Sequence, residues 1–314
     1  MNILANDGLE TTAIEQLEML GHQVYTEKIS QENLSDFCNS NGIKILIVRS
    51  ATKVTAPIIE QFETVQLIIR AGVGIDNINQ DAAKSKNITV CNTPKSSSNA
   101  VAELVFAHVL NLARKISYVD NGLKNNGDFK ILKNASSDCF ELKGKKIGIV
   151  GFGRIGQSVA QIALGFGMEV IAHDPLRKTI VLPITIAQQN INVEIPSVSF
   201  NAIITQSDII TFHIPFNANG SPLINELIFK QFKPNVILVN TARGGIIDET
   251  LLIKALQEQQ ILGACLDTFI NEPLLNTELL KEPMVSLSPH TGGSTKEAQI
   301  AIGQEIVDIV ANFK

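Results

Sequence analysis

The sequence of 314 residues has no excess of positive charge, few aromatic residues and no basic stripe interleaved with aromatic side chains. Its net charge is −5, its pI is about 5.6, and 5% of its residues are aromatic. Proteins that bind nucleic acids typically carry a basic footprint on one face. The composition therefore argues against a nucleic acid as a partner.

Long apolar runs and paired cysteines are also lacking. No run reaches the ~18 residues of a membrane-spanning helix, and the opening MNILANDGLE has neither the basic nor the apolar segment of a secretory signal. We therefore expect a soluble, cytoplasmic protein with no membrane partner. The cysteines occur singly, so we expect neither disulfides nor a metal site, and we interpret them as small core side chains. They are Cys38, Cys91, Cys139 and Cys265.

The most informative stretch is KIGIVGFGRIG, an apolar run that leads straight into the pattern G-x-G-x-x-G. This pattern is typical of the turn between a strand and a helix in dinucleotide-binding domains, although the hexapeptide alone also occurs in glycine-rich turns that bind nothing. Gly151 permits the tight turn, Gly153 lets the backbone approach a pyrophosphate, and Gly156 lets the helix pack closely on the strand.

A second apolar run, MEVIAHD, ends in Asp174. This is about 20 residues beyond the glycines, where an acidic residue typically binds the ribose 2′-hydroxyl of a dinucleotide. A carboxylate at this place repels a 2′-phosphate, so we expect NAD rather than NADP as the cofactor.

Alternating strand-like and helix-like segments predict an α/β protein with two doubly wound parallel sheets. We expect residues 1–95 and 290–314 to form a discontinuous, flavodoxin-like substrate domain. Residues 96–289 are expected to form a Rossmann domain that binds the dinucleotide. A chain that leaves one domain, builds a second and returns has two crossings, which predict a hinge and a cleft between the domains.

Several local segments carry their own expectations. The apolar stripe over residues 97–117 predicts a long helix, either an ordinary core helix or one that also contacts a second subunit. Residues 125–146 are expected to be a loop, and residues 223–232 a helix. Residues 175–207 mix β-branched residues with prolines, so no element can be assigned there from the pattern.

Three charged residues follow predicted strands of the second domain: Arg243 in NTARGG, Glu272 in INEP and His290 in SPHTGG. A guanidinium can hold a carboxylate in bidentate fashion. If Glu272 and His290 touch, the carboxylate orients the imidazole and favours its protonated form, which is a general acid for a carbonyl and, once deprotonated, a base for an alcohol. Singly, each residue also has a structural interpretation. Arg243 could form a surface ion pair, Glu272 could be an acid in a loop, and His290 could be a histidine at the start of a helix. Together, beside a nucleotide site, they indicate hydride transfer.

These motifs also carry a family resemblance. GFGRIG with its downstream acid, HIP at 213–215, NTARGGIIDE, NEP and SPHTGGSTKEAQ occur in the order and spacing of the D-isomer-specific 2-hydroxyacid dehydrogenases. The chain resembles this family over essentially its whole length. VRSATKVT at 48–55 and RAGVGIDNI at 70–78 look most like its phosphoglycerate dehydrogenase branch.

The resemblance implies the NAD-dependent oxidation of D-3-phosphoglycerate to 3-phosphohydroxypyruvate, in serine biosynthesis. It implies that His290 is the acid/base, that Glu272 is its partner, and that Arg243 binds the substrate carboxylate. It also implies a homodimer or homotetramer, built on the nucleotide domain and the long helix near residue 100.

Carried over residue by residue, the resemblance implies two sets of binding residues. NAD is expected to contact Gly151, Gly153, Arg154, Ile155, Gly156, Asp174, His213, Ile214, Pro215, Thr241, Ala242, Asp267 and Gly292. The substrate is expected to contact Arg49, Ser50, Lys53, Arg70, Val73, Gly74 and Arg243. A phosphorylated substrate requires cations in addition to the arginine that binds its carboxylate. Arg49, Lys53 and Arg70 can supply them. Equally, Lys53 could be solvated and Arg70 could have a structural partner.

Two other functions stay open at this point. A hydroxypyruvate or glyoxylate reductase would share all the catalytic residues. A corepressor of the same fold that senses NAD and binds proteins is disfavoured, because the sequence has no extended low-complexity tails. Since the sequence ends soon after the closing helix, we expect no small regulatory domain and no feedback by serine.

Overall fold

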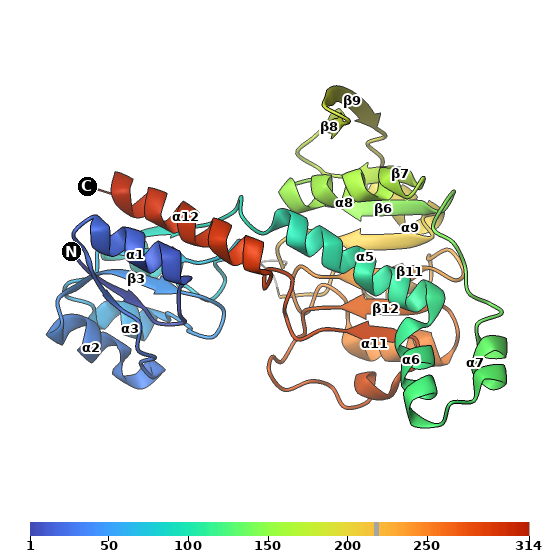
Figure 1. Cartoon of the computed structure of the whole chain (residues 1–314), viewed down its shortest axis with the longest axis horizontal. Helices are drawn as coiled ribbons and strands as arrows, with labels where there is room; N and C mark the ends of the chain where they lie inside the picture. The colour runs from blue at the N-terminus through green and yellow to red at the C-terminus, as the bar shows by residue number, and fades with distance from the viewer. Residues whose placement is uncertain (217–219, 314) are drawn as a thin grey trace. The chain divides into compact units, whose positions relative to one another are not determined.

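The computed structural model describes residues 1–216 and 220–313, and the chain divides into two compact units. Unit 1 comprises residues 1–100 together with the chain from Gly293 onward, and unit 2 comprises residues 101–292. Figure 1 shows that each unit contains its own sheet and its own helices. No helix of the described residues is both long and apolar enough to cross a membrane.

Unit 1 is built on a five-stranded parallel sheet with the order β2-β1-β3-β4-β5. This order is that of flavodoxin-like folds, so the predicted fold class is confirmed. The short edge strand β2 is not among the expected strands. The strands are β1 (Asn2–Ala5), β2 (Gln23–Tyr25), β3 (Ile43–Val48), β4 (Leu67–Arg70) and β5 (Thr89–Asn92).

Helices cover both faces of this sheet because its strands are apolar on both sides. Successive side chains of a strand point to opposite faces, so Ile45 and Ile47 join one core cluster while Leu46 and Val48 join the other. The first cluster includes side chains of α1 (Thr11–Met19) and α12 (Lys296–Asn312), which lie side by side (Figure 1). The second includes those of α2 (Leu34–Ser40), α3 (Ala56–Gln61) and α4 (Gln80–Ser85).

Unit 2 is built on a six-stranded parallel sheet with the order β13-β12-β11-β10-β6-β7. The order reverses between β6 and β10, so the loops after these two strands diverge. Such a switch point is where open α/β sheets bind dinucleotides. The strands are β6 (Lys146–Val150), β7 (Glu169–His173), β10 (Ile209–Phe212), β11 (Ile237–Asn240), β12 (Gly263–Leu266) and β13 (Val285–Leu287).

Two core clusters again cover the two faces of the sheet. One contains side chains of α5 (Ser98–Arg114) and α8 (Arg154–Gly165). The other contains side chains of α9 (Phe200–Gln206), α10 (Glu226–Phe229) and α11 (Glu249–Gln257). The helices α6 (Ile116–Asn125) and α7 (Phe129–Ala135) follow α5, and short 3-10 turns span Gln31–Asn33 and Leu279–Lys281.

The structure corrects two local expectations. Residues 125–146 are not simply a loop, because Asp128 caps α7 by accepting a hydrogen bond of 3.0 Å from the backbone N–H of Ile131. The helix expected over 223–232 is only α10. It begins late because the backbone N–H of Ile224 donates to the carbonyl of Ile246, at 3.0 Å, and holds this part of the chain extended.

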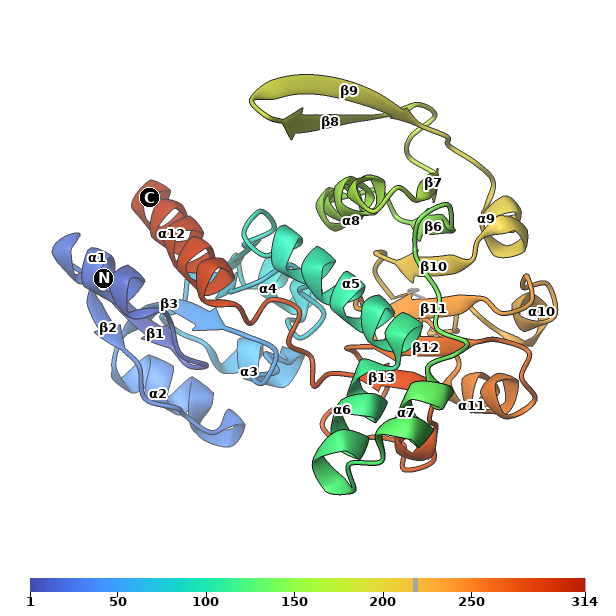
Figure 2. The ribbon, with the colours of Figure 1, turned by 45° about the vertical axis from the view of Figure 1, so that its right-hand side comes forward.

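The unassigned stretch after Asp174 contains α9 and an antiparallel hairpin of β8 (Ile180–Ile186) and β9 (Gln189–Ile195). The two residues of the hairpin turn, Ala187 and Gln188, both have left-handed φ angles, of 46° and 67°. This conformation is typical of a tight hairpin turn. Figure 2 shows the hairpin standing out from unit 2 beyond α8. Its base is buried in the core at Leu182, which has 0% exposure, whereas Ile186 at the tip is 58% exposed.

The packing of the hairpin base can be tested by substitution. We expect Leu182→Ala to lower the free energy of unfolding by about 2–5 kcal/mol, because it removes a fully buried side chain. The matched change Ile186→Ala at the exposed tip should cost about 0.5 kcal/mol or less. Urea unfolding of both variants measures this, and an equal loss at the two positions would contradict the packing.

Candidate functional site

The glycine turn between β6 and α8 has the geometry that its sequence predicts. Gly151 has a φ of 91°, and a Cβ placed on it would lie 2.5 Å from the carbonyl oxygen of His213. A Cβ on Gly156 would lie 2.3 Å from the carbonyl oxygen of Gly151. A Cβ on Gly153 would meet no protein atom within 4 Å, so this glycine leaves open space at the first turn of α8.

Asp174 lies directly after β7 and anchors this turn. Its Oδ2 accepts a hydrogen bond of 3.0 Å from the backbone N–H of Phe152, and its Oδ1 accepts one of 3.0 Å from the backbone N–H of Leu176. The Nε of Arg177 lies 3.9 Å from Oδ2. The carboxylate therefore holds the glycine turn against β7 and places a negative charge beside it.

Polar atoms without a protein partner lie at the ends of the neighbouring strands. Within residues 1–216 and 220–313, the buried Thr241 Oγ1 and His213 Nδ1 have no hydrogen-bond partner. Burial lowers the pKa of His213 to about 3, so this ring is neutral. Its Nε2 lies 2.9 Å from the hydroxyl of Thr211. Open space at the glycine turn, an anchored carboxylate and two orphaned polar atoms fit a bound dinucleotide.

The other residues expected to contact NAD lie on the same loops. Arg154 and Ile155 form the first turn of α8, Ile214 and Pro215 follow β10, and Ala242 follows β11. Arg154 and Pro215 are exposed, and the other three are half-buried.

Arg243 is held by the loop that follows β11. The side chain of Asn240 donates to the carbonyl of Arg243, at 2.8 Å, and accepts from the backbone N–H of Ala242, at 3.2 Å. The Nη1 of Arg243 donates to the carbonyl of Ala242, at 2.6 Å. A Cβ on Gly244 would lie 2.0 Å from the carbonyl oxygen of Phe269, so this glycine allows the loops after β11 and β12 to meet.

His290 and Glu272 touch. The distance from His290 Nδ1 to Glu272 Oε2 is 2.7 Å, and Glu272 Oε1 accepts a bond of 3.0 Å from the backbone N–H of Phe269. Burial raises the pKa of Glu272, but the hydrogen bonds from His290 and Phe269, with the charge of Arg243, bring that pKa below its usual value. The carboxylate is therefore ionised and accepts a hydrogen bond from Nδ1–H of His290, which leaves Nε2 for another partner.

Asp267 fixes the two residues that follow His290 in the sequence. Its Oδ1 accepts from the backbone N–H of Thr291, at 2.7 Å, and its Oδ2 accepts from that of Gly292, at 2.8 Å. His290 itself has a left-handed φ of 53°. The structure thus shows a supporting role for Asp267 and Gly292 in the His290 loop, and their contact with NAD remains a prediction.

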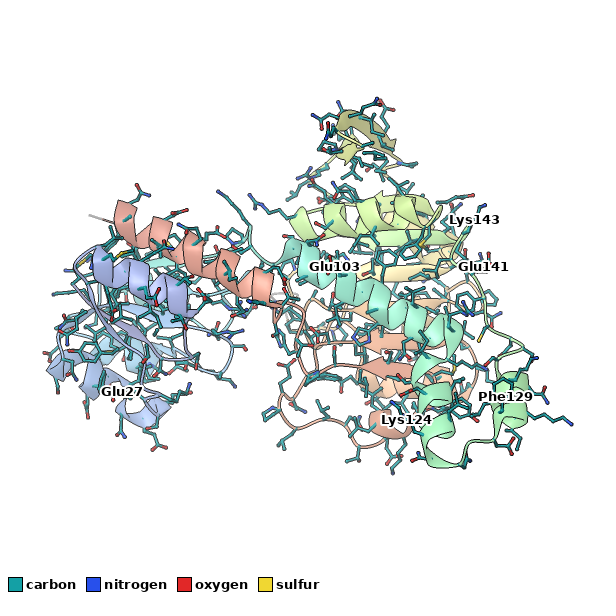
Figure 3. All side chains as sticks on the ribbon, viewed as in Figure 1. Glu27, Glu103, Lys124, Phe129, Glu141 and Lys143 are labelled. Carbon is teal, nitrogen blue, oxygen red and sulfur yellow. The ribbon has the colours of Figure 1, made fainter. Side chains whose placement is uncertain are left out.

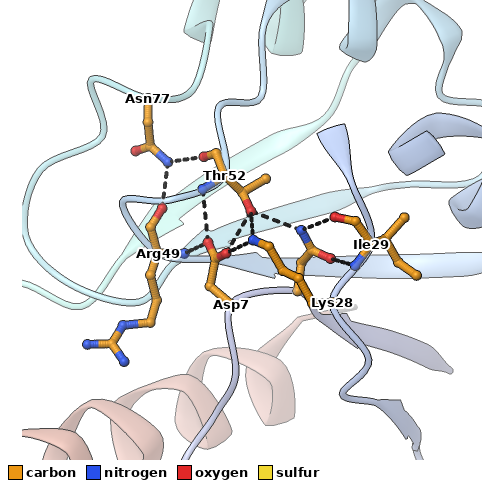
Figure 4. A network of polar contacts seen from close by, with 7 residues as sticks. Asp7, Lys28, Ile29, Arg49, Thr52 and Asn77 are labelled. Carbon is orange, nitrogen blue, oxygen red and sulfur yellow. Dashed lines mark hydrogen bonds and ion pairs between the residues drawn. The ribbon is translucent and has the colours of Figure 1, made fainter. Parts of the chain in front are cut away.

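In unit 1, Asp7 organises the loop that carries Arg49 (Figure 4). Asp7 accepts hydrogen bonds from the backbone N–H of Arg49, at 2.7 Å, and from the hydroxyl of Thr52, at 2.8 Å, and it pairs with Lys28. Asn77 donates to the carbonyls of both Arg49 and Thr52, at 2.7 Å each. Figure 4 shows the guanidinium of Arg49 pointing away from this network.

The same loop borders a pocket of about 450 Å³ at the ends of β1 and β3. Arg49 and Ser50 both line it, together with Asp7 and Lys28. Among the described residues, the guanidinium of Arg49 has no hydrogen-bond or ion-pair partner. Lys53 is exposed.

The glycine-rich loop after β4 carries the remaining expected substrate residues. The Nη1 of Arg70 donates to the carbonyl of Ala71, at 3.3 Å, and the carbonyl of Val73 accepts from the side chain of Asn92, at 2.5 Å. Val73 and Gly74 are half-buried.

Asp7, Asn77 and Asn240 were not identified from the sequence. Asp7 follows the first strand in NILAND, so the rule that functional groups collect at strand ends could have pointed to it. Asn77 and Asn240 act through loop carbonyls, and no local pattern marks that role.

Known proteins similar to this chain identify its family. Residues 106–292 match the family model of the D-isomer specific 2-hydroxyacid dehydrogenase, NAD binding domain. The D-3-phosphoglycerate dehydrogenase of Methanocaldococcus jannaschii is 38% identical over 309 residues, which cover 98% of this chain and 56% of that protein. The hydroxypyruvate reductase of Thermotoga maritima is 38% identical over 310 residues, which cover 96% of this chain and 95% of that protein.

Among solved structures, a glyoxylate reductase from Paecilomyes thermophila has a TM-score of 0.85 at 26% identity, over 99% of this chain and 94% of that one. The chain spans only about half the length of the similar phosphoglycerate dehydrogenases. The region of this chain that matches the family model, residues 106–292, includes the glycine turn, Asp174 and the pair of Glu272 and His290. The chain therefore belongs to the D-isomer specific 2-hydroxyacid dehydrogenase family and contains its NAD-binding domain.

Proposed function

We propose that the protein is an NAD-dependent D-2-hydroxyacid dehydrogenase that oxidises D-3-phosphoglycerate to 3-phosphohydroxypyruvate. The observation that carries this proposal is the pair of Glu272 and His290, 2.7 Å apart, in a unit that also holds Arg243 and the dinucleotide-type turn. When bound, NAD would supply the acceptor of the hydride. The turn from Gly151 to Gly156, Asp174 and the ends of β10 and β11 would hold it.

The chemistry of the protein's own residues follows from the tautomer of His290. Because Nδ1 donates to Glu272, the free Nε2 of the neutral ring takes the proton of the substrate hydroxyl as hydride leaves the same carbon. The ionised Glu272 stabilises the imidazolium that forms. Arg243, oriented by its bond to the Ala242 carbonyl, binds the substrate carboxylate. In the reverse direction, the imidazolium returns the proton to the carbonyl oxygen.

Recognition of a phosphate is proposed for Arg49. Asp7 and Asn77 fix its backbone on both sides, and its guanidinium has no partner among the described residues. A preorganised cation of this kind suits an anionic group. Ser50 on the same loop and Lys53, with Arg70, Val73 and Gly74, complete the proposed substrate set.

Hydroxypyruvate reduction is the second candidate. It is supported by the match to the Thermotoga maritima hydroxypyruvate reductase, of which the aligned region covers 95%. The two candidates share the catalytic pair and Arg243. They differ in whether the substrate carries a phosphate, so the role of Arg49 separates them.

A homodimer is proposed as the assembly. The helices α6 and α7 place several large apolar side chains at the surface, among them Phe129, which is 69% exposed and is labelled in Figure 3. The same helices border a cavity of about 530 Å³ with Leu112 and Met284. Apolar surface of this kind is typical of a protein interface, and a second copy of the chain is the occupant we propose.

The acid/base role can be tested with His290→Gln. We expect kcat/KM to fall by about 10²–10⁴-fold, the usual contribution of general acid–base catalysis, while NADH binding, followed by fluorescence, persists. His22→Gln in unit 1 is the control and should leave turnover unchanged. Activity of the His290 variant within threefold of the parent would reject the proposed role, and NADH binding without turnover in the parent would favour a binding protein.

The phosphate role can be tested with Arg49→Ala. Loss of a charge-assisted hydrogen bond worth about 1.5–3 kcal/mol lowers kcat/KM for 3-phosphoglycerate by about 10–100-fold. Activity with hydroxypyruvate should change much less, and the exposed Lys86→Ala serves as a charge-matched control. If both substrates lose equally, Arg49 does not recognise the phosphate and the reductase becomes the better candidate.

The pH dependence of stability tests the loop that supports Arg49. Burial raises the pKa of Asp7, but hydrogen bonds from Lys28, Arg49 and Thr52 bring it below its usual value. A carboxyl group whose pKa is lower in the folded state adds stability above its unfolded pKa and loses it as the pH falls. We expect Asp7→Asn to lower the unfolding free energy by about 2 kcal/mol at pH 7. The deficit should shrink below about pH 4, and a deficit independent of pH in urea unfolding would contradict this.

A further inference from the structure

A chain of hydrogen-bonded side chains runs from α5 to the loop that carries the catalytic histidine. Asn111 Nδ2 donates to Ser286 Oγ, at 2.9 Å, and Ser286 Oγ lies 2.7 Å from His108 Nδ1. His108 Nε2 lies 2.8 Å from Ser288 Oγ, which donates to Asp267 Oδ1, at 2.5 Å. His108 is 5% exposed. This histidine has no part in the proposed mechanism.

The two ends of the chain fix the direction of every bond. Asn111 Oδ1 accepts from the backbone N–H of Ser117, at 2.8 Å, so its amide nitrogen must face Ser286. At the other end, the carboxylate of Asp267 can only accept, so the hydroxyl of Ser288 must donate to it. Each hydroxyl has a single hydrogen. Ser288 Oγ therefore accepts from His108 Nε2–H, and Ser286 Oγ–H donates to His108 Nδ1.

This arrangement requires a neutral His108 with its proton on Nε2. A protonated ring would donate through both nitrogens and would leave the buried hydroxyl of Ser286 without an acceptor. Burial lowers the pKa of His108, and the charge of Asp267 only partly opposes this. One protonation state thus satisfies every group in the chain.

The chain ends where the catalytic loop is anchored. Asp267 holds the backbone N–H groups of Thr291 and Gly292, and the backbone N–H of His290 donates to the carbonyl of Ser288, at 3.0 Å. His290 is in a left-handed conformation, which is unfavourable for a residue with a side chain. The bonds on both sides of it must hold that conformation.

We propose that His108 is a positioning residue for His290. It acts by holding Ser288 and Asp267, which in turn hold the loop that presents His290 to Glu272. A neutral buried histidine is well suited to this task, because it donates on one side and accepts on the other. The kinetic consequences rest on the proposed dehydrogenase activity, whereas the protonation state of His108 does not.

The protonation state is tested by nitrogen NMR of the full chain labelled with ¹⁵N-histidine. The sequence has five histidines, and His108→Gln identifies the signals of position 108 by their loss. We expect the neutral Nε2–H tautomer, unchanged between pH 5.5 and 8.5. A proton on Nδ1, or titration within this range, overturns the proposed chain whether or not the protein is a dehydrogenase.

The positioning role is tested by comparing His108→Phe with His108→Gln. Phenylalanine keeps the ring and removes both hydrogen bonds, whereas glutamine restores one donor and one acceptor. Because small misplacements of catalytic groups are costly, we expect the phenylalanine variant to lose about tenfold in kcat, with KM values within twofold, and the glutamine variant to recover most of kcat. His22→Gln is the control.

Ser286→Ala provides a milder change if the phenylalanine variant does not fold, and we expect a loss of about threefold in kcat. If kcat stays within twofold of the parent in the folded variants while only Tm falls, His108 is merely structural and the proposal fails. Failure of glutamine to recover activity also counts against it. If the parent oxidises no 2-hydroxy acid, the proposed function fails. The NMR result still decides the protonation state of His108 and the direction of its hydrogen bonds.

Discussion

All strands of both central sheets run parallel, and this shared direction collects the functional loops of each unit at one edge of its sheet. In unit 2, the ends of β6 and β7 supply the glycine turn and Asp174, and the loops after β11, β12 and β13 supply Arg243, Glu272 and His290. In unit 1, likewise, Asp7 lies after β1 and Arg49 lies after β3. The proposed chemistry depends on this constraint, because these side chains come from distant parts of the sequence.

Support for the proposed catalytic pair of Glu272 and His290 is spread over several layers of hydrogen bonds. Glu272 orients the ring of His290, Asp267 fixes the residues that follow it, and Ser288 connects Asp267 to His108 on α5. The last of these contacts joins the loop to a helix, because His108 lies on α5. A strained, left-handed histidine can therefore be kept in one orientation while its Nε2 stays open to a substrate.

The glycine turn, Asp174 and the pair of Glu272 and His290 could be predicted from the sequence because each lies in a short pattern with a direct physical meaning. The hairpin of β8 and β9 could not, because its β-branched residues and prolines fit several structures. The contacts of Asp7 and His108 have no local sequence pattern for a different reason. Their partners lie far away in the sequence, at Arg49 and Ser288, and only the folded sheet brings them together.

The most direct measurement is the formation of NADH from NAD by the purified protein with a panel of D-2-hydroxy acids, with and without a phosphate. The account predicts turnover with D-isomers alone and the highest kcat/KM for D-3-phosphoglycerate. Turnover that favours unphosphorylated acids would contradict the proposed substrate. No NADH from any member of the panel, nor NADH consumption with the corresponding 2-oxo acids, would contradict the enzymatic function itself.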